Sequence, residues 1–127
     1  MNYLKTYLQK ITGRGNIKLA ESISKTAEDV GSSHLKNFSF TSHETGLLFG
    51  NVQSGKTGQM FGILCKAADL GFPVFLILTT DNVILQQQAL DRVKADLEGF
   101  CICGENDTGL FADNSLILPA IVVLKKN

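Results

Sequence analysis

Apolar side chains recur every three or four residues in the N-terminal part of the chain, which is the spacing of amphipathic helices. Leu4, Leu8 and Ile11 form one such series, and a second series runs from Ile17 to Val30. Residues spaced in this way lie on one face of a helix. The sequence therefore predicts two helices joined by a short glycine-containing turn.

The rest of the chain alternates short apolar runs with helical patterns. The continuous run Val74–Leu78 is typical of a parallel strand buried on both faces. The other expected elements, in order, are strand 46–49, helix 58–70, a helix with Asp81 or Asn82 as N-cap that continues to Leu97, strand 100–102 and strand 120–124. This alternation predicts an α/β fold with a parallel sheet and right-handed crossovers.

Between these two parts, residues 32–45 show no clear period and are expected to form a loop. Phe38 and Phe40 alternate with polar neighbours there. The alternation fits a short strand, a pair of aromatic rings beside an adenine, or simple packing. Simple packing is the favoured interpretation.

Composition narrows the class of protein. With 127 residues, 44% of them hydrophobic, the chain is long enough for one globular domain with a real core. Its 12 basic and 12 acidic residues cancel, so no overall field attracts nucleic acid or an anionic membrane. No stretch is long and apolar enough to cross a membrane, and no signal peptide is recognisable.

Cysteine usage points to a reducing compartment. The three cysteines are an odd number, and Cys101 and Cys103 are too close in sequence for a disulfide framework, so we expect a cytoplasmic protein. With only His34 and His43 as further ligands, a zinc site lacks a recognisable second pair. The cysteines are better interpreted as small core residues.

One contiguous motif carries candidate chemistry. It satisfies the phosphate-binding pattern G-x-x-x-x-G-K-[ST] and consists of Gly50, Asn51, Val52, Gln53, Ser54, Gly55, Lys56 and Thr57, with Gly58 directly after it. In such loops backbone N–H groups surround a phosphate, and the next helix directs its positive dipole end at the same anion. Lys56 would reach the β- and γ-phosphates of ATP, and the Thr57 hydroxyl would hold Mg²⁺.

Other parts of an ATP-hydrolysing site are not evident. Such enzymes also need an acidic residue after a second strand and an arginine on the γ-phosphate. Asp81 follows an apolar strand and is a candidate magnesium ligand, but helix capping is the favoured role at this position. Neither Arg14 nor Arg92 has the surroundings of an arginine finger. By itself the chain is expected to bind nucleotide better than it hydrolyses it.

The motifs V-Q-S-G-K-T at 52–57 and A-A-D-L-G-F at 67–72, followed by an apolar strand and the glutamine run 86–88, resemble the Z-one domain family. Members of that family are bacterial endonuclease-like or helicase-like ATPases related to superfamily 2 helicases. The similarity covers about Thr45–Leu97 and implies a RecA-like P-loop domain that uses ATP and Mg²⁺. It places Gln53, Gly55, Lys56 and Thr57 in helicase motif I, and Thr79, Thr80, Asp81, Asn82 and Gln87 in a motif that contacts the nucleic-acid backbone.

The resemblance also implies an incomplete motor. Residues 1–44 would be an N-terminal helical segment, and residues 45–127 a P-loop domain that stops before the acidic Walker B motif and the second motor lobe. The leading hypothesis is thus the N-terminal part of a nucleic-acid-dependent ATPase whose C-terminal part is missing, with DNA as the expected partner of the full-length protein. One alternative is a self-contained P-loop or kinase-like protein with Asp81 as magnesium ligand, and the other is a nucleotide-gated interaction module.

Overall fold

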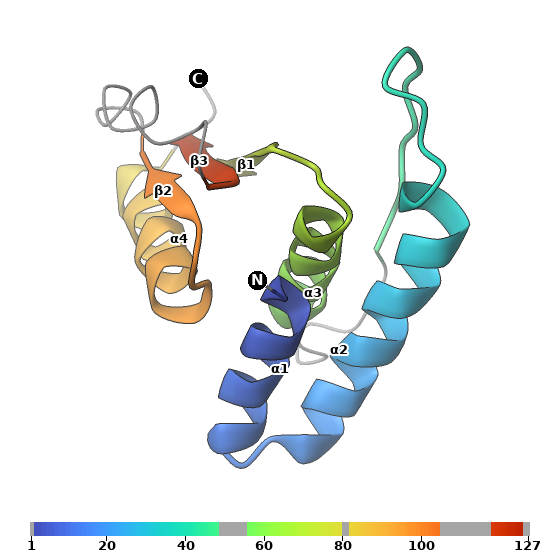
Figure 1. Ribbon diagram of the computed structural model, residues 1–127. Helices are drawn as coiled ribbons and strands as arrows, with labels where there is room; N and C mark the ends of the chain where they lie inside the picture. Colours follow the sequence, from blue (N-terminus) through green and yellow to red (C-terminus); the bar gives the residue numbers. More distant parts are fainter. Residues whose placement is uncertain (1, 49–55, 80–81, 105–117, 126–127) are drawn as a thin grey trace. The chain divides into compact units, whose positions relative to one another are not determined.

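The computed structural model describes residues 2–48, 56–79, 82–104 and 118–125, which contain both helices and a parallel sheet (Figure 1). The contacts divide the chain into two compact units, Asn2–Leu70 and Gly71–Asn127. The helix that follows the phosphate motif packs with the N-terminal helices and therefore belongs to the first unit.

The first unit is helical. It consists of α1 (Tyr3–Gly13), α2 (Ile17–Val30), the short π-helix η1 (Gly31–Leu35) and α3 (Lys56–Asp69). The two N-terminal helices predicted from the apolar spacing are confirmed, and α3 confirms the helix expected over 58–70. Its end is also as expected, since Gly71 has a φ of +96°, a conformation that glycine adopts without strain.

The core of the helical unit lies where α3 packs against both α1 and α2 (Figure 1). Ile23 is 0% exposed, and Tyr7, Phe61 and Cys65 are buried with it. A Cβ atom on Gly62 would lie only 2.4 Å from the Cγ2 atom of Ile23, so this glycine allows a close approach of α2 and α3. The packing with α3 therefore buries most of the apolar face of each N-terminal helix, although Ile17 at the start of α2 stays exposed.

The second unit is a three-stranded sheet with one helix. Its elements are β1 (Val74–Thr79), α4 (Val83–Asp96), β2 (Cys101–Cys103) and β3 (Ala120–Lys125). The strand order is β1-β3-β2, and both pairs are parallel. The helix packs against all three strands (Figure 1). The predicted α/β class with a parallel sheet is confirmed.

The strand expected before the phosphate motif is not formed in the residues that can be described. Gly46, Leu47 and Leu48 have no regular secondary structure, and Leu47 is 79% exposed, while Phe49 lies outside the described residues. A single extended segment is not stable as a strand unless its backbone hydrogen-bonds to a neighbouring strand. In the described sheet, no strand pairs with residues 46–48. The polar turn expected over 104–114 falls almost entirely outside the described residues.

Residues 36–48 form no strand either. The rings of Phe38 and Phe40 pack edge to face, with their centroids 5.3 Å apart. Of the three interpretations of their alternation, the short strand is excluded. The packed pair agrees with simple packing.

Candidate functional site

The phosphate motif leads directly into α3, whose first residue is Lys56. Residues 50–55 lie outside the described part of the chain. Lys56 and Thr57 are the two motif residues that the structure describes. Lys56 is exposed and Thr57 is half-buried, both in the first helical turn. The first N–H groups of a helix have no intrahelical partner, and the helix dipole adds a positive potential there. A cation, a hydroxyl and backbone N–H groups without an intrahelical partner thus lie at one helix terminus.

Gly58, which the sequence placed with the nucleotide-binding residues, also has a packing role. Its carbonyl oxygen accepts a buried hydrogen bond from the Tyr7 hydroxyl at 3.4 Å. A Cβ atom at this position would lie 3.3 Å from Cδ1 of Ile23. Glycine at 58 therefore lets α1 and α2 approach the first turn of α3.

Gln59 connects the same turn to α2. Its side-chain Nε2 donates to the Ser22 hydroxyl at 2.9 Å, while the residue is only 9% exposed. Its Oε1 is buried and accepts no hydrogen bond within the described structure. Because an unpaired buried amide group costs free energy, Ser22 is an important partner for this side chain.

Sequence reasoning did not identify Tyr7, Ser22 or Ile23 as neighbours of the candidate site. One signal was present, since Gly58 and Gly62 are four residues apart and therefore share a helix face. Two glycines on one face are compatible with a closely packed partner helix. The pattern does not reveal which helix that partner is.

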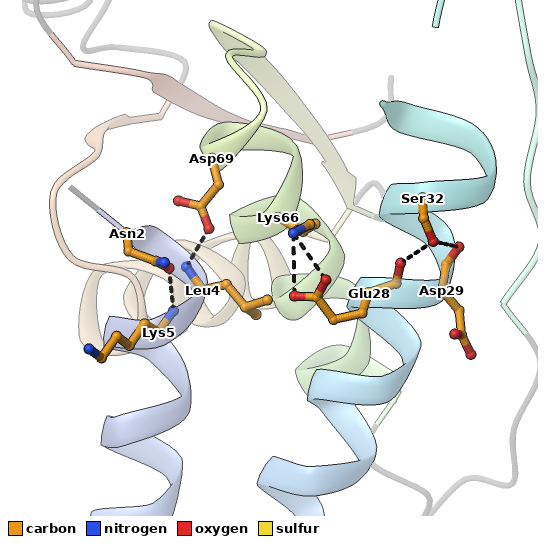
Figure 2. Close-up of polar contacts among 8 residues, drawn as sticks. All are labelled: Asn2, Leu4, Lys5, Glu28, Asp29, Ser32, Lys66 and Asp69. Atoms are coloured by element: carbon orange, nitrogen blue, oxygen red, sulfur yellow. Dashed lines mark hydrogen bonds and ion pairs between the residues drawn. The ribbon is translucent and has the colours of Figure 1, made fainter. Parts of the chain in front are cut away.

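A second group of polar contacts links the opposite end of α3 to the N-terminal helices (Figure 2). The Asp69 carboxylate accepts hydrogen bonds from the backbone N–H groups of Tyr3 at 2.6 Å and Leu4 at 3.2 Å. An acidic residue in the last turn of a helix is normally unfavourable, but here it lies at the positive N-terminus of α1. Lys66 pairs with Glu28 on α2 at 3.1 Å. These contacts join the three helices. They give Asp69 of the A-A-D-L-G-F motif a structural role at the start of α1.

The same carboxylate affects two nearby titratable groups. Burial, with a smaller effect of the Asp69 charge, raises the pKa of the Cys65 thiol to about 12. Burial and then Asp69 also raise the pKa of the Tyr3 phenol. All three cysteines are buried and free, as expected for small core residues.

The raised pKa predicts an inert thiol at Cys65. Only the thiolate reacts with alkylating agents, and at pH 8 about one Cys65 thiol in ten thousand would be ionised. We expect iodoacetamide to label Cys65 very slowly in the native protein at pH 8 and rapidly in urea, as measured by mass spectrometry of peptides. Fast native labelling would contradict the burial of this side chain.

An open groove of about 580 Å³ runs between α1, α2 and α3. Lys5, Glu28, Lys66 and Asp69 contribute its charged lining. Lys66 and Glu28 pair with each other, and Asp69 accepts from the first backbone N–H groups of α1. Neither Lys56 nor Thr57 lines this groove, so it does not coincide with the candidate phosphate site.

The residues expected to contact nucleic acid belong to the sheet unit. The Thr79 hydroxyl donates to the Leu124 carbonyl at 3.1 Å, and the Asn82 side chain accepts from the N–H groups of Ile84 and Leu85 as the N-cap of α4. Gln87 donates to the Asp91 carboxylate one turn later at 2.9 Å. Each of these side chains therefore has a local structural role. Thr80 and Asp81 lie outside the described residues.

Within the described ranges, no three His, Cys, Asp or Glu side chains gather closely enough to hold a metal ion. None of the described helices is long and apolar enough to cross a membrane. A comparison of the chain with protein-family models, curated proteins and solved structures found no match.

Proposed function

We propose that this chain binds MgATP at the N-terminus of α3, as part of a nucleic-acid-dependent ATPase. The observation that carries the proposal is the continuity of the motif with the helix. All fixed positions of G-x-x-x-x-G-K-[ST] are present, and α3 begins at the lysine of that motif. A helix N-terminus behind such a loop supplies backbone donors and a favourable dipole to a phosphate.

The described residues fit the expected cofactor. Lys56 supplies an exposed ammonium group for the phosphates, and Thr57 supplies a hydroxyl ligand of the kind that Mg²⁺ accepts. The bound metal ion would neutralise the negative charge of the β- and γ-phosphates. Lys56 would orient the same phosphates, and Thr57 would fix the metal relative to α3.

The nucleic-acid part of the proposal comes from the resemblance to the Z-one domain family. Hydroxyl and amide groups at the end of β1 and the start of α4 are of the type that donates to phosphate oxygens. Because Thr79, Asn82 and Gln87 already have intramolecular partners, contact with nucleic acid would add to these interactions or replace them.

One observation favours the kinase-like alternative as a second candidate. The Asn82 side chain accepts hydrogen bonds from two N–H groups of α4 and is sufficient as its cap. Asp81 is therefore not needed for capping, and its carboxylate stays a candidate magnesium ligand. Loss of Mg²⁺-dependent nucleotide affinity in Asp81→Asn protein would support this alternative.

Replacing Lys56 with alanine tests the proposed function. A charge-assisted hydrogen bond to phosphate contributes about 1.5–3 kcal/mol, so we expect the dissociation constant for MgATP to rise about tenfold to a hundredfold. Isothermal titration calorimetry measures it directly. Lys25→Ala is the matched control, since Lys25 is an exposed lysine on α2. Equal affinity of Lys56→Ala and wild-type protein would refute the assignment.

A further inference from the structure

We propose that Tyr7 and Ser22 are positioning residues for the nucleotide. They hold the first turn of α3 and thereby place Lys56 and Thr57. The inference rests on the proposed function, because it concerns the same phosphate site. It assigns to the N-terminal helices a role that the phosphate motif alone does not indicate.

Tyr7 acts from α1. Its hydroxyl donates to the carbonyl oxygen of Gly58, the residue after Thr57, at 3.4 Å in the buried core. Its ring packs against Phe61 of α3, with centroids 6.3 Å apart and planes at 66°. The ring therefore fixes the position from which the hydroxyl contacts the first turn, and loss of the hydroxyl alone leaves the ring packing in place.

Ser22 acts from α2. The described structure gives the Gln59 amide one hydrogen bond, from Nε2 to the Ser22 hydroxyl at 2.9 Å, and its Oε1 has none. Without Ser22 the whole amide, in a residue 9% exposed, would lack its protein partner. A side chain in that state gains free energy by moving toward water, and Gln59 is only two residues after Thr57.

Ile23 makes the attachment rigid. It is fully buried against α3, and Cβ atoms at Gly58 and Gly62 would lie 3.3 Å and 2.4 Å from its side chain. Close packing of this kind permits few alternative positions of the helix. The first turn of α3 is thus held by contacts from two other helices.

This attachment matters for affinity because a ligand binds only the fraction of molecules whose site is in the competent geometry. The apparent dissociation constant is the intrinsic constant divided by that fraction. Removing either polar contact loosens the turn, which Ile23 still holds in part, and so lowers that fraction, although neither Tyr7 nor Ser22 is part of the phosphate motif. A purely structural role would lower the melting temperature and leave the affinity of the folded protein unchanged.

The test uses the full chain with Tyr7→Phe and Ser22→Ala. We expect each variant to bind MgATP about twofold to tenfold more weakly, the factor that corresponds to one net hydrogen bond. Calorimetry well below the melting temperature measures the change, and circular dichroism checks that both variants are folded. Tyr3→Phe is the matched control on α1, and Ser22→Thr, which keeps a hydroxyl, should bind like wild type.

Hydrogen exchange gives a second readout. In wild-type protein, MgATP should slow amide exchange in α1 and α2, because a ligand on the first turn of α3 also stabilises the helices attached to it. This protection should be smaller in Tyr7→Phe and Ser22→Ala. Wild-type affinity in both variants, with unchanged protection of α1 and α2, would overturn the positioning role while leaving the proposed function intact. A wild-type chain that binds no MgATP would overturn both.

Discussion

Replacing Ile23 with alanine should lower the free energy of unfolding by about 2–5 kcal/mol, because it leaves a cavity in the middle of the helical unit. Ile23 is fully buried between α2 and α3. Its side chain packs directly on Gly58 and Gly62, where an added Cβ atom would lie 3.3 Å and 2.4 Å from it. Urea unfolding followed by circular dichroism measures the loss. Ile17→Ala is the control, since Ile17 is on the same helix and is exposed.

A second substitution shows whether the loss comes from this contact. Gly62→Ala should destabilise wild-type protein, since its Cβ atom would lie 2.4 Å from Cγ2 of Ile23. In Ile23→Ala protein that methyl group is gone, so the added Cβ should be tolerated and should partly fill the cavity. Additive effects of the two substitutions would contradict direct packing of Ile23 on Gly62.

Replacing Ile121 with alanine should cost a similar amount, about 2–5 kcal/mol, in the sheet unit. Ile121 is 0% exposed and lies in β3, the central strand, between Phe75 of β1 and Ile102 of β2 in the register. The same urea experiment applies, with hydrogen exchange to show that the loss is concentrated in residues 71–127. Leu76→Ala on β1, where the side chain is 65% exposed, should have little effect. A comparable loss in Leu76→Ala protein would show that this face of the sheet is covered in solution.

Local patterns predicted most of the elements. Apolar spacing located α1, α2, α3 and α4, and continuous apolar runs located β1 and β3, because period and run length are properties of neighbouring residues. Asn82 was one of two expected caps, and it is the residue whose side chain accepts from the first turn of α4. The strand expected over 46–49 is not formed at 46–48, and a short apolar run has the same appearance whether or not a partner strand pairs with it.

Features that depend on distant residues could not be predicted. The phosphate motif is contiguous and can be recognised directly, but its supports at Tyr7 and Ser22 are 51 and 37 residues away from their partners on α3. Asp69 contacts Tyr3 across 66 residues, although nothing near it in the sequence distinguishes it from an exposed acid. The grouping of α3 with the N-terminal helices follows from the same long-range packing and not from any break in composition.

The position of β3 in the sheet has a consequence for the order in which the chain folds as it is synthesised. β3 pairs with both β1 and β2, yet it is made after them, and the hydrogen bond between Thr79 and Leu124 spans 45 residues. In the described sheet β1 and β2 do not pair with each other, so neither can complete its pairing before β3 is made, while all the residues of the helical unit 2–70 precede β1 in the chain. During that interval β1 lacks the strand with which it pairs in the described sheet, and strand edges without their partner favour aggregation of nascent chains.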